Sequence, residues 1–410
     1  MKNTMRHVQD LSKGILGAPD SDVLWTEITN YIPDEVLLKP DVKILNVACG
    51  HGTEADILVK RMFALGKSPE EILDSIYVLD KYNVFTSQMT MKGYRHVIKA
   101  DFMSWEPDME FDVIVGNPPY QESKDHGKKV TGNGALWVQF TTRAFSFVKK
   151  GGFVSFVIPD SVLAPTYDMM GSRVSIFNDI FKQLNLSYLN VDVKQYFPAI
   201  GITPIAFVVE NNTNYTTTKI ETSDGNMMLS IKNMRFIPKD TSKINIAIHQ
   251  KLLAEQLNSD LFKMRWVREV TSLDAQNEKK EGMFPVLDSH SFKPVRWSEK
   301  KDPDFERAKV LVTYVGEYQC IVDDGNIGAK ESVSVRYLKD KETLDSANSF
   351  YNSKLIRYVM NSNRWTQYLL SQILNYIPCP DLTRTWTDEE LYAHFDLTPE
   401  EIEYIEANVT

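Results

Sequence analysis

The sequence has few cysteines and no long apolar run. Its three cysteines in 410 residues, Cys49, Cys320 and Cys379, lie far apart and form no CxxC motif or Cys/His pair. They support neither a zinc site nor a disulfide framework, and they favour a reducing environment. No segment approaches the roughly 20 apolar residues of a membrane span, and the amino terminus lacks the apolar segment of a signal peptide. We therefore expect a cytoplasmic protein without membrane contact.

Metal-binding patterns are absent from the sequence as well. The seven histidines show no ligand spacing, and there is no internal repeat. The composition, with 43% hydrophobic and 25% charged residues, is that of an ordinary globular protein. A chain of this length can bury at least one large core and is expected to form two or more domains. We expect no metal.

The chain also lacks an excess of positive charge, since its net charge is −9. Phosphate contacts normally come from Lys and Arg, so this balance at first argues against a polyanionic partner. The acid is concentrated, however, because residues 381–410 contain nine acidic residues and one basic residue. The stretch from Lys263 to Lys309 has eleven basic and nine acidic residues. Overall acidity therefore does not exclude DNA.

The sequence does contain a regular series of short apolar runs separated by helical segments. This pattern is typical of βαβ units and predicts an α/β fold with a Rossmann-like parallel sheet. Residues 211–219, rich in Asn and Thr, predict a loop. The expected helices are 54–65 and 136–149, the second ended by Gly151 and Gly152. The expected strands are 44–48, 75–79, 96–98, 112–115, 153–158, 188–193 and 204–210.

The βαβ pattern stops near residue 240, which predicts a domain boundary there. Residues 1–240 would form the first domain, and residues 241–380 a second domain of mixed α+β character. In residues 381–410, two helices are expected to start with capping boxes, at Thr387 with Glu390 and at Thr398 with Glu401. We expect this acidic stretch to form a third, helical segment.

A glycine-rich turn follows the first expected strand. The residues from Asn46 to Gly52, Asn-Val-Ala-Cys-Gly-His-Gly, lead from a buried strand into a helix. Glycines there let the backbone approach a ligand at the carboxyl edge of the sheet, where open α/β sheets bind cofactors. The pattern is not GxGxxG and no Walker lysine follows, so dinucleotide and phosphate binding are disfavoured. A tight structural turn is the alternative.

The next two strand ends carry acidic residues. Asp80 ends the second strand, at the place where such folds bind ribose hydroxyls. Asp101 and Phe102 follow the third strand, and an acid beside an aromatic ring suits an adenine. The alternative is an Asp that caps a turn beside a core Phe. Several polar strand ends at one edge are more informative than any single one.

The fourth strand end carries the most specific pattern, Asn117-Pro118-Pro119-Tyr120. An exocyclic amine on a purine is a poor nucleophile because its lone pair is delocalised. The Asn117 side-chain oxygen and the Pro118 carbonyl can each accept one of the amine hydrogens. The two prolines restrict the backbone, and Tyr120 offers a ring on which a flipped base can stack. A packing turn is the alternative.

In this order, the motifs resemble the γ-class, TaqI-type N6-adenine DNA methyltransferases over roughly residues 44–209. Further matching segments are Gly151 to Pro159, Tyr196-Phe197-Pro198 and Ile202 to Val209. The resemblance implies a seven-stranded Rossmann-like methyltransferase sheet, S-adenosyl-L-methionine as cofactor, and a C-terminal target-recognition domain. It also implies a bacterial or phage-infected cell as the setting.

The resemblance also implies roles for individual residues. Asn117, Pro118, Pro119 and Tyr120 would engage the target base, and Phe197 would supply a second stacking contact, although periodicity alone makes Phe197 a core residue. The family usually has an acidic residue where this chain has Asn46, which implies weaker cofactor binding. The residues expected to bind the cofactor are Asn46, Ala48, Gly50 and Gly52 around the methionine part, Asp80 at the ribose, and Asp101 with Phe102 at the adenine.

DNA contacts are expected from basic residues near glycines or aromatic residues. Lys128 and Lys129 belong to a glycine-containing basic loop after the fourth strand, which could close on the DNA. The alternative is a solvated loop without DNA contact. Arg268, Lys293 and Arg296 lie next to or near tryptophans in the second domain. Charge runs are usually solvated, so we expect DNA contact from this region as a whole more than from any single residue in it.

The expected function is site-specific transfer of a methyl group from S-adenosyl-L-methionine to N6 of a flipped-out adenine in duplex DNA. Its partners would be double-stranded DNA and a cognate restriction endonuclease. One alternative keeps the chemistry and changes the substrate to an RNA adenine or a protein glutamine. The other is a catalytically inactive DNA-binding or anti-restriction module, which only Asn46 favours.

Overall fold

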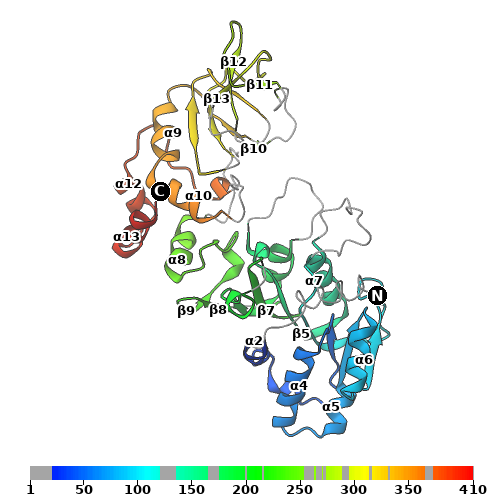
Figure 1. Cartoon of the computed structure of the whole chain (residues 1–410). Helices are drawn as coiled ribbons and strands as arrows, with labels where there is room; N and C mark the ends of the chain where they lie inside the picture. The colour runs from blue at the N-terminus through cyan, green and yellow to red at the C-terminus, as the bar shows by residue number, and fades with distance from the viewer. Residues whose placement is uncertain are drawn as a thin grey trace. The chain divides into compact units, whose positions relative to one another are not determined.

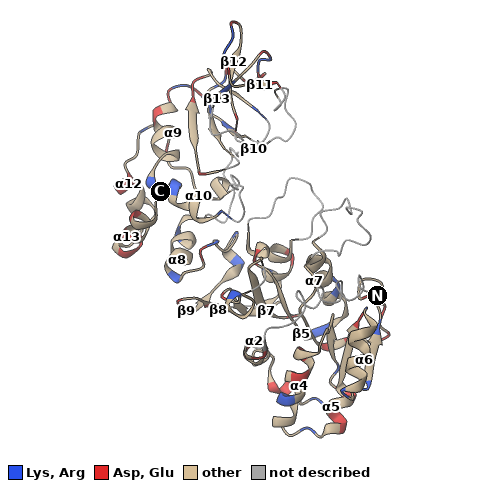
Figure 2. Ribbon diagram, in the orientation of Figure 1, with Lys and Arg blue, Asp and Glu red and all other residues tan. Residues whose placement is uncertain are grey.

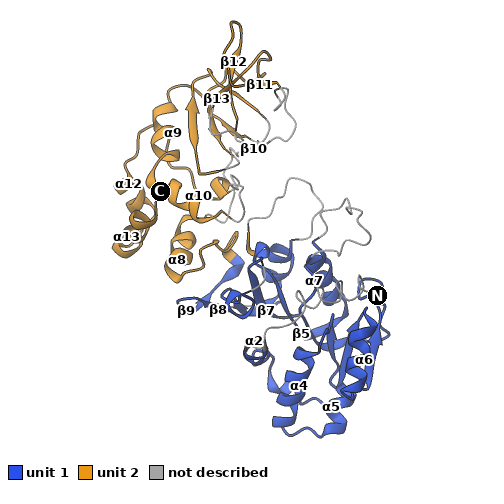
Figure 3. Ribbon diagram, viewed as in Figure 1, with its two compact units in different colours: residues 1–162, 170–232 blue, residues 163–169, 233–410 orange. Residues whose placement is uncertain are grey.

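The protein is described here by a computed structural model that divides into two compact units (Figure 3). Unit 1 comprises residues 1–162 and 170–232, and unit 2 comprises residues 163–169 and 233–410. The division after residue 232 precedes the expected boundary at residue 240, and residues 381–410 belong to unit 2. The structure describes residues 21–120, 135–164, 175–198, 201–214, 217–253, 263–264, 270, 274–288, 295–313, 316–330, 333–364 and 373–409.

Unit 1 is built around one nine-stranded sheet in the order β3-β2-β1-β4-β5-β7-β6-β8-β9. Figure 1 labels β5, β7, β8 and β9 of this sheet. The strands β1 to β5 run parallel, and β7 runs antiparallel to both β5 and β6. The strands are β1 (Ile44–Val47), β2 (Ile76–Asp80), β3 (His96–Lys99), β4 (Phe111–Gly116), β5 (Val148–Pro159), β6 (Asn185–Asn190), β7 (Pro204–Glu210), β8 (Thr218–Thr222) and β9 (Gly225–Leu229). All seven expected strands are present, and the Rossmann-like fold is confirmed.

The hairpin of β8 and β9 extends the sheet beyond the seven expected strands. The expected loop at 211–219 is too long, because β8 already starts at Thr218. Thr218, Ile220 and Thr222 are buried at alternate positions, as in a strand that covers a core. Gly225, at the turn, has φ +107°, which glycine adopts without strain. The alternation and the Asp-Gly turn were the sequence signals for this hairpin.

The expected helix 136–149 ends two residues too late. The helix α7 stops at Phe147, and Val148 already pairs with Phe111 as the first residue of β5. Gly151 and Gly152 therefore lie inside β5 instead of ending the helix. A Cβ atom on Gly152 would lie 2.7 Å from the carbonyl oxygen of Asp112, so this glycine permits a close strand approach.

Helices pack on the sheet and form the core of unit 1 with it. The hydrophobic core joins Leu24 and Trp25 of α2, Leu58 and Met62 of α4, and the sheet face that contains Ile44, Val78 and Val115. Helix α5 starts at a capping box of Ser68 and Glu71, with Pro69 in its first turn. The helices of unit 1 are α2 (Ser21–Thr29), α3 (Asp34–Leu37), α4 (Thr53–Ala64), α5 (Pro69–Ser75), α6 (Asn83–Met91), α7 (Leu136–Phe147), the π-helix η2 (Ile176–Phe181) and the 3₁₀ helix η3 (Lys194–Tyr196). Two further 3₁₀ helices, η1 (Asp160–Leu163) and η4 (Ile231–Asn233), span the divisions between the units.

Unit 2 contains two small four-stranded sheets, β10-β17-β14-β15 and β11-β13-β12-β16, together with helices. The strands are β10 (Lys263–Met264), β11 (Ala275–Gln276), β12 (Phe284–Leu287), β13 (Val295–Ser298), β14 (Lys309–Val312), β15 (Cys320–Asp323), β16 (Gly328–Ala329) and β17 (Ser334–Tyr337). The helices are α8 (Lys243–Leu252), α9 (Leu344–Tyr351), α10 (Lys354–Ser362), α11 (Ile373–Tyr376), α12 (Asp388–His394) and α13 (Pro399–Asn408).

The acidic C-terminal helices are part of the main core of unit 2. Leu391 and Ile405 are fully buried and pack in one cluster with residues of α8, α9 and α10. Both expected capping boxes are present at the starts of α12 and α13. Their acidic residues lie along these helices in Figure 2. No helix among the described residues is both long and apolar enough to cross a membrane.

Candidate functional site at the carboxyl edge of the sheet

The sheet register brings the expected motifs to one edge of unit 1. At the end of β1, Val47 pairs with Leu79 of β2 on one side and with Gly116 of β4 on the other. The glycine turn, Asp80 and Asn117 therefore start side by side. The end of β3 joins them, because the Ala100 N–H donates to the Asp80 carbonyl at 3.2 Å. Parallel strands place their carboxyl ends at one edge, where such sheets bind ligands.

The glycine turn has an unusual backbone. Gly50 and Gly52 have φ values of +50° and +80°, and Ala48 has φ +48° although it carries a side chain. A non-glycine residue in this region costs free energy and is often found at functional sites. A Cβ atom on Gly52 would lie 2.5 Å from the Met89 sulfur, so this position requires glycine for space as well as conformation.

Asp80 connects the end of β2 to the glycine turn. Its carboxylate accepts hydrogen bonds from the Gly50 N–H at 3.1 Å and from the Tyr82 N–H at 2.8 Å. Desolvation raises the pKa of Asp80, although these backbone hydrogen bonds oppose the rise. The carboxylate therefore holds the turn in place, and two oxygens can accept more bonds than these two. Ribose binding by Asp80 stays a prediction.

Asn46 is fully buried at the end of β1. Its Nδ2 donates to the Val115 carbonyl at 3.3 Å, whereas its Oδ1 has no hydrogen-bond partner among the described residues. Asn46, Val115 and Ser155 are aligned across β1, β4 and β5, so their side chains point to the same face as the core residues. A buried acceptor without a partner is costly and indicates a missing donor.

The sequence interpretation misses Glu54, a buried acid in the same place. Glu54 lies in the first turn of α4, directly after the glycine turn, and is only 7% exposed. Desolvation raises its pKa to about 7, while hydrogen bonds from its own N–H and from the Asn46 side chain lower it. The sequence did contain a signal for Glu54, because this acid lies directly after the Asn46–Gly52 turn, where the usual acidic residue is replaced by Asn46.

The Asn117–Tyr120 segment leaves β4 at a point of very close packing. A Cβ atom on Gly116 would lie 2.5 Å from the Val47 carbonyl oxygen, so only glycine fits between β4 and β1. Pro118 is buried, and Asn117 is half-buried with no hydrogen bond from its side chain to another described residue. The half-buried Tyr120 has a hydroxyl without a partner in the described chain, and desolvation raises its pKa.

Two aromatic residues expected to contact ligands lie in the core instead. Phe102 is 1% exposed and packs against Phe140 and Phe147, with ring centroids 5.0 and 6.0 Å apart. Phe197 is 5% exposed and belongs to the hydrophobic core of unit 1. Asp101 is exposed and accepts from the Met103 N–H at 3.0 Å, as a turn-capping residue does. Stacking by either ring and adenine binding by Asp101 stay predictions.

Most of the expected DNA-contacting residues, namely Lys128, Lys129, Arg268 and Lys293, lie outside the described residues. Arg296 is described, and its guanidinium is held within the protein by the buried Asp288 carboxylate at 2.8 Å and by the Ala275 carbonyl. These contacts tie β13 to β11 and to the end of β12. The structure thus gives Arg296 a structural role, and a contact with DNA stays a prediction.

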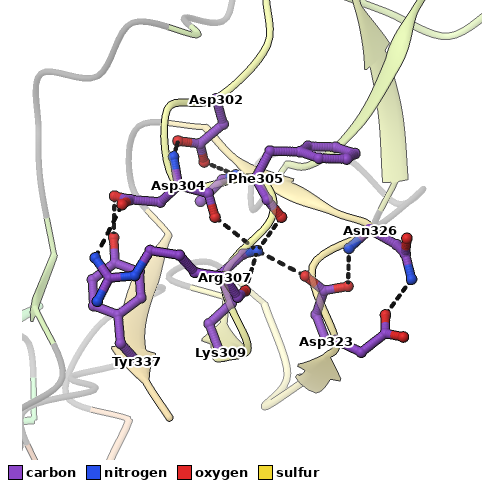
Figure 4. Close-up of polar contacts among 10 residues, drawn as sticks. Asp302, Asp304, Phe305, Arg307, Lys309, Asp323, Asn326 and Tyr337 are labelled. Carbon is purple, nitrogen blue, oxygen red and sulfur yellow. Dashed lines mark hydrogen bonds and ion pairs between the residues drawn. The ribbon is translucent and has the colours of Figure 1, made fainter. Parts of the chain in front are cut away.

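Unit 2 also contains a fully paired buried lysine, drawn in Figure 4. The Lys309 ammonium lies 2.7 Å from the Asp323 carboxylate, and both side chains are almost completely buried. It also donates to the carbonyls of Asp304, Phe305 and Arg307 at 3.2, 3.0 and 3.0 Å. These contacts fix the turn before β14, so this lysine is structural rather than a nucleic-acid contact.

The residues at the sheet edge fit a cofactor that offers hydrogen-bond donors. Four buried polar atoms of unit 1 have no partner among the described residues: Asn46 Oδ1, His51 Nε2, the Tyr120 hydroxyl and Ser155 Oγ, which lies in the same row of the sheet as Asn46. The positive φ angles of the glycine turn bring its backbone close to the same space. S-adenosyl-L-methionine has an ammonium group, ribose hydroxyls and an adenine amine. In the described part of the chain, no group of three His, Cys, Asp or Glu residues could hold a metal.

The strand order, the antiparallel β7 and the motifs at one edge define a class I methyltransferase fold. Residues 61–186 match the sequence model of a family described as Eco57I restriction-modification methylase. This segment includes Asp80, Asp101 and Asn117–Tyr120, and the match confirms the expected resemblance.

The curated relatives include two methylases of this kind and one methyltransferase of another kind. Modification methylase CviBIII of Paramecium bursaria Chlorella virus NC1A is 25% identical over 128 residues, covering 30% of this chain and 32% of the relative. An uncharacterized adenine-specific methylase of Mycoplasma pneumoniae is 25% identical over 170 residues, covering 38% of each. Trans-aconitate 2-methyltransferase of Rhizobium rhizogenes is 25% identical over 128 residues, covering 31% of this chain and 43% of the relative. The chain thus spans less than half the length of these relatives.

A solved structure extends the likeness to the fold of nearly the whole chain. The type IIL restriction-modification enzyme MmeI in complex with DNA has a TM-score of 0.50 and 11% sequence identity. The alignment covers 98% of this chain and 74% of that chain. At this identity the likeness concerns the fold.

Proposed function

We propose that this chain is a DNA methyltransferase that transfers a methyl group from S-adenosyl-L-methionine to N6 of an adenine flipped out of the duplex. The main support for the proposal is the position of Asn117. It directly follows Gly116, where only glycine fits, and its side chain has no hydrogen bond to another described residue. A free acceptor in a fixed place is what an amine substrate requires.

The roles of the chain's residues follow from the chemistry of an exocyclic amine. Asn117 Oδ1 and the Pro118 carbonyl accept the two N6 hydrogens and so turn the nitrogen lone pair away from the purine plane. Tyr120 stacks on the base. When bound, S-adenosyl-L-methionine supplies an electrophilic methyl group. The N6 proton leaves to solvent after the new bond forms, so Asn117 and Pro118 position the amine and no strong general base is needed.

The same four residues would also suit the amide of a protein glutamine or an RNA adenine. Two observations favour DNA. The family matched by residues 61–186 is described as a restriction-modification methylase, and a second unit of some 180 residues follows the catalytic-type fold. A partner endonuclease and the recognition sequence stay predictions.

The test is expression of the chain in a host without adenine methylation, followed by sequencing that detects modified bases. We expect N6-methyladenine at one recurring sequence in the host DNA. Asn117→Ala should lower the methylation rate about 100- to 1,000-fold, in the range seen when one positioned hydrogen-bonding group is removed from an active site. Asn214→Ala, at an exposed position of unit 1, is the matched control and should methylate normally.

Unmodified DNA from a soluble, folded protein would contradict the DNA assignment. Methylated glutamine or methylated RNA in the same cells would identify the alternative substrate. A thermal shift with S-adenosyl-L-methionine separates these results from an inactive module, because a protein that binds the cofactor is stabilised by it whatever its substrate is.

A further inference from the structure

The acidic side chain of Glu54 is buried in unit 1, and the described part of the chain places no compensating cation beside it. Among the described residues, no Lys, Arg or His forms an ion pair with it. The nearby Lys92 pairs with the Asp56 carboxylate at 2.6 Å and donates to the His51 carbonyl at 2.7 Å. Buried carboxylates are normally paired, because the desolvation of an isolated charge is very costly. The described residues therefore do not explain why the Glu54 carboxylate is buried.

The electrostatic surroundings of Glu54 make it a site for positive charge. Asp22 on α2 and Asp56 on α4 act on it as like charges. Burial is the largest cause that raises the pKa values of the Cys49 thiol and the Tyr94 hydroxyl, and the negative charge of Glu54 adds to the rise. Both groups are therefore neutral near pH 7. A cation placed here would be attracted by every neighbouring carboxylate.

The Asn46 amide completes the arrangement of acceptors. One Nδ2 hydrogen is used by the Val115 carbonyl, and the Asn46 side chain lies close enough to the Glu54 carboxyl to lower its pKa. The Oδ1 atom remains, fully buried and without a partner in the described chain. The Glu54 carboxylate and this amide oxygen are thus two adjacent acceptors, which suits an ammonium group that has three donors.

We propose that Glu54 replaces the acidic residue missing at position 46 and, together with Asn46 Oδ1, binds the ammonium group of the cofactor's amino-acid part. This inference rests on the proposed function, because it requires that the chain binds S-adenosyl-L-methionine. It reverses one expectation from the sequence. Asn46 no longer implies weak cofactor binding, since the acid has moved from the end of β1 to the first turn of α4.

The inference is tested by binding measurements on the full chain with two ligands. S-adenosylhomocysteine carries the ammonium group, whereas 5′-methylthioadenosine has the same nucleoside and thioether without the amino acid. Glu54→Gln should weaken S-adenosylhomocysteine about 10- to 100-fold, the range for a hydrogen bond between charged groups, and leave 5′-methylthioadenosine unchanged. Glu35→Gln, an exposed acid on the neighbouring α3, is the matched control and should change neither affinity.

The pH dependence of binding gives a second measurement. Glu54 must be charged to bind the ammonium, and its pKa without ligand is raised to about 7, first of all by desolvation. The affinity of the wild-type chain for S-adenosylhomocysteine should therefore fall about tenfold between pH 8 and pH 6. The Glu54→Gln variant should not show this fall, although Asp22 and Asp56 remain in place.

The possible results separate the two proposals. If the wild-type chain binds neither ligand, the proposed function fails. If it binds both and Glu54→Gln weakens them equally, or weakens neither, the role of Glu54 is overturned while the proposed function stands. The melting temperature of Glu54→Gln without ligand shows that any loss is not due to unfolding, because removal of an unpaired buried charge should not lower it.

Discussion

In unit 2 the buried ammonium of Lys309 has four oxygen acceptors, one carboxylate and three carbonyls, whereas in unit 1 the buried carboxylate of Glu54 has no cation among the residues that the structure describes. A second pair in unit 2, Lys330 and Asp288, is 2.7 Å apart and fully buried, and Asp288 also binds Arg296. Both units thus bury charged groups of similar cost. They differ in whether the protein itself supplies the partner.

This difference separates groups that stabilise the fold from groups that, in our proposal, bind a ligand. A buried charge with its partners in place fixes the backbone around it, as Lys309 fixes the turn before β14. A buried polar atom without a partner costs free energy in the free protein. A natural protein can keep such an unfavourable atom where ligand binding compensates for it. In unit 1, buried atoms without a partner lie near the sheet edge that contains the sequence motifs.

The largest effect is expected when the pair in unit 2 is broken. Asp323→Asn leaves the Lys309 ammonium buried without a counter-charge, so the free energy of unfolding of unit 2 should fall by about 3–5 kcal/mol, measured by urea denaturation. Glu342→Gln, an exposed acid of the same unit, is the control and should be within about 0.5 kcal/mol of wild type. Cofactor binding by the folded protein should not change. If Asp323→Asn lowered the free energy of unfolding by less than about 1 kcal/mol, the buried pair of unit 2 would not be the stabilising contact that we infer.

The opposite sign is expected for the unpaired acid of unit 1. The pKa of Glu54 is raised from its ordinary 4.5 to about 7, largely by desolvation. The unfolded chain therefore binds fewer protons than the folded chain between these values, and folding loses stability as the pH rises through this window. Glu54→Gln should be more stable than wild type by about 3 kcal/mol at pH 8, with no difference well below pH 4.5.

Urea denaturation without ligand at pH 8 and well below this lower pH measures the difference. Groups other than Glu54 titrate in both proteins, so the comparison of variant with wild type isolates the one carboxylate. A variant less stable than wild type at pH 8 would mean that the Glu54 carboxylate has a stabilising partner within the protein.

The smallest effect is expected at a neutral unpaired group. The Tyr120 hydroxyl is buried and has no partner among the described residues, so Tyr120→Phe removes an unsatisfied group and should raise the free energy of unfolding by about 1 kcal/mol. Tyr94 offers the matched comparison, because its hydroxyl donates to the Asp56 carboxylate at 2.6 Å. Tyr94→Phe should lose about 1.5–3 kcal/mol, as expected for a hydrogen bond to a charged group. Equal losses in both variants would show that Tyr120 is paired.

Much of unit 1 could be predicted from sequence because its signals are local. Seven buried strands appear as apolar runs, and the motifs at their ends have fixed positions relative to those runs. Once the strands are parallel, the ends of β1, β2 and β4 must meet, so Asp80 and Asn117 come together without knowledge of any side-chain contact. The end of α7 was misplaced because strand pairing of Val148 outweighs the glycines that follow it.

The roles of individual side chains were harder to predict, because they depend on contacts distant in sequence. Phe102 and Phe197 carry family motifs, yet their burial follows from packing against residues elsewhere in the chain, such as Phe140 of α7. Arg296 looks like a free cation in the sequence, and only the pairing of β12 and β13 places it beside Asp288. Charge and aromaticity along the chain do not reveal whether a partner is near.

The sequence by itself determined the class of fold and the edge of the sheet at which the motifs meet, and it predicts that Asn117–Tyr120 bind an amine, since each depends on residues next to one another along the chain. Only the tertiary structure decided which buried polar groups are paired. Asn46 and Glu54 are separated by the glycine turn, and only the folded chain shows that Glu54 is buried and that the Asn46 side chain lies close enough to affect its pKa.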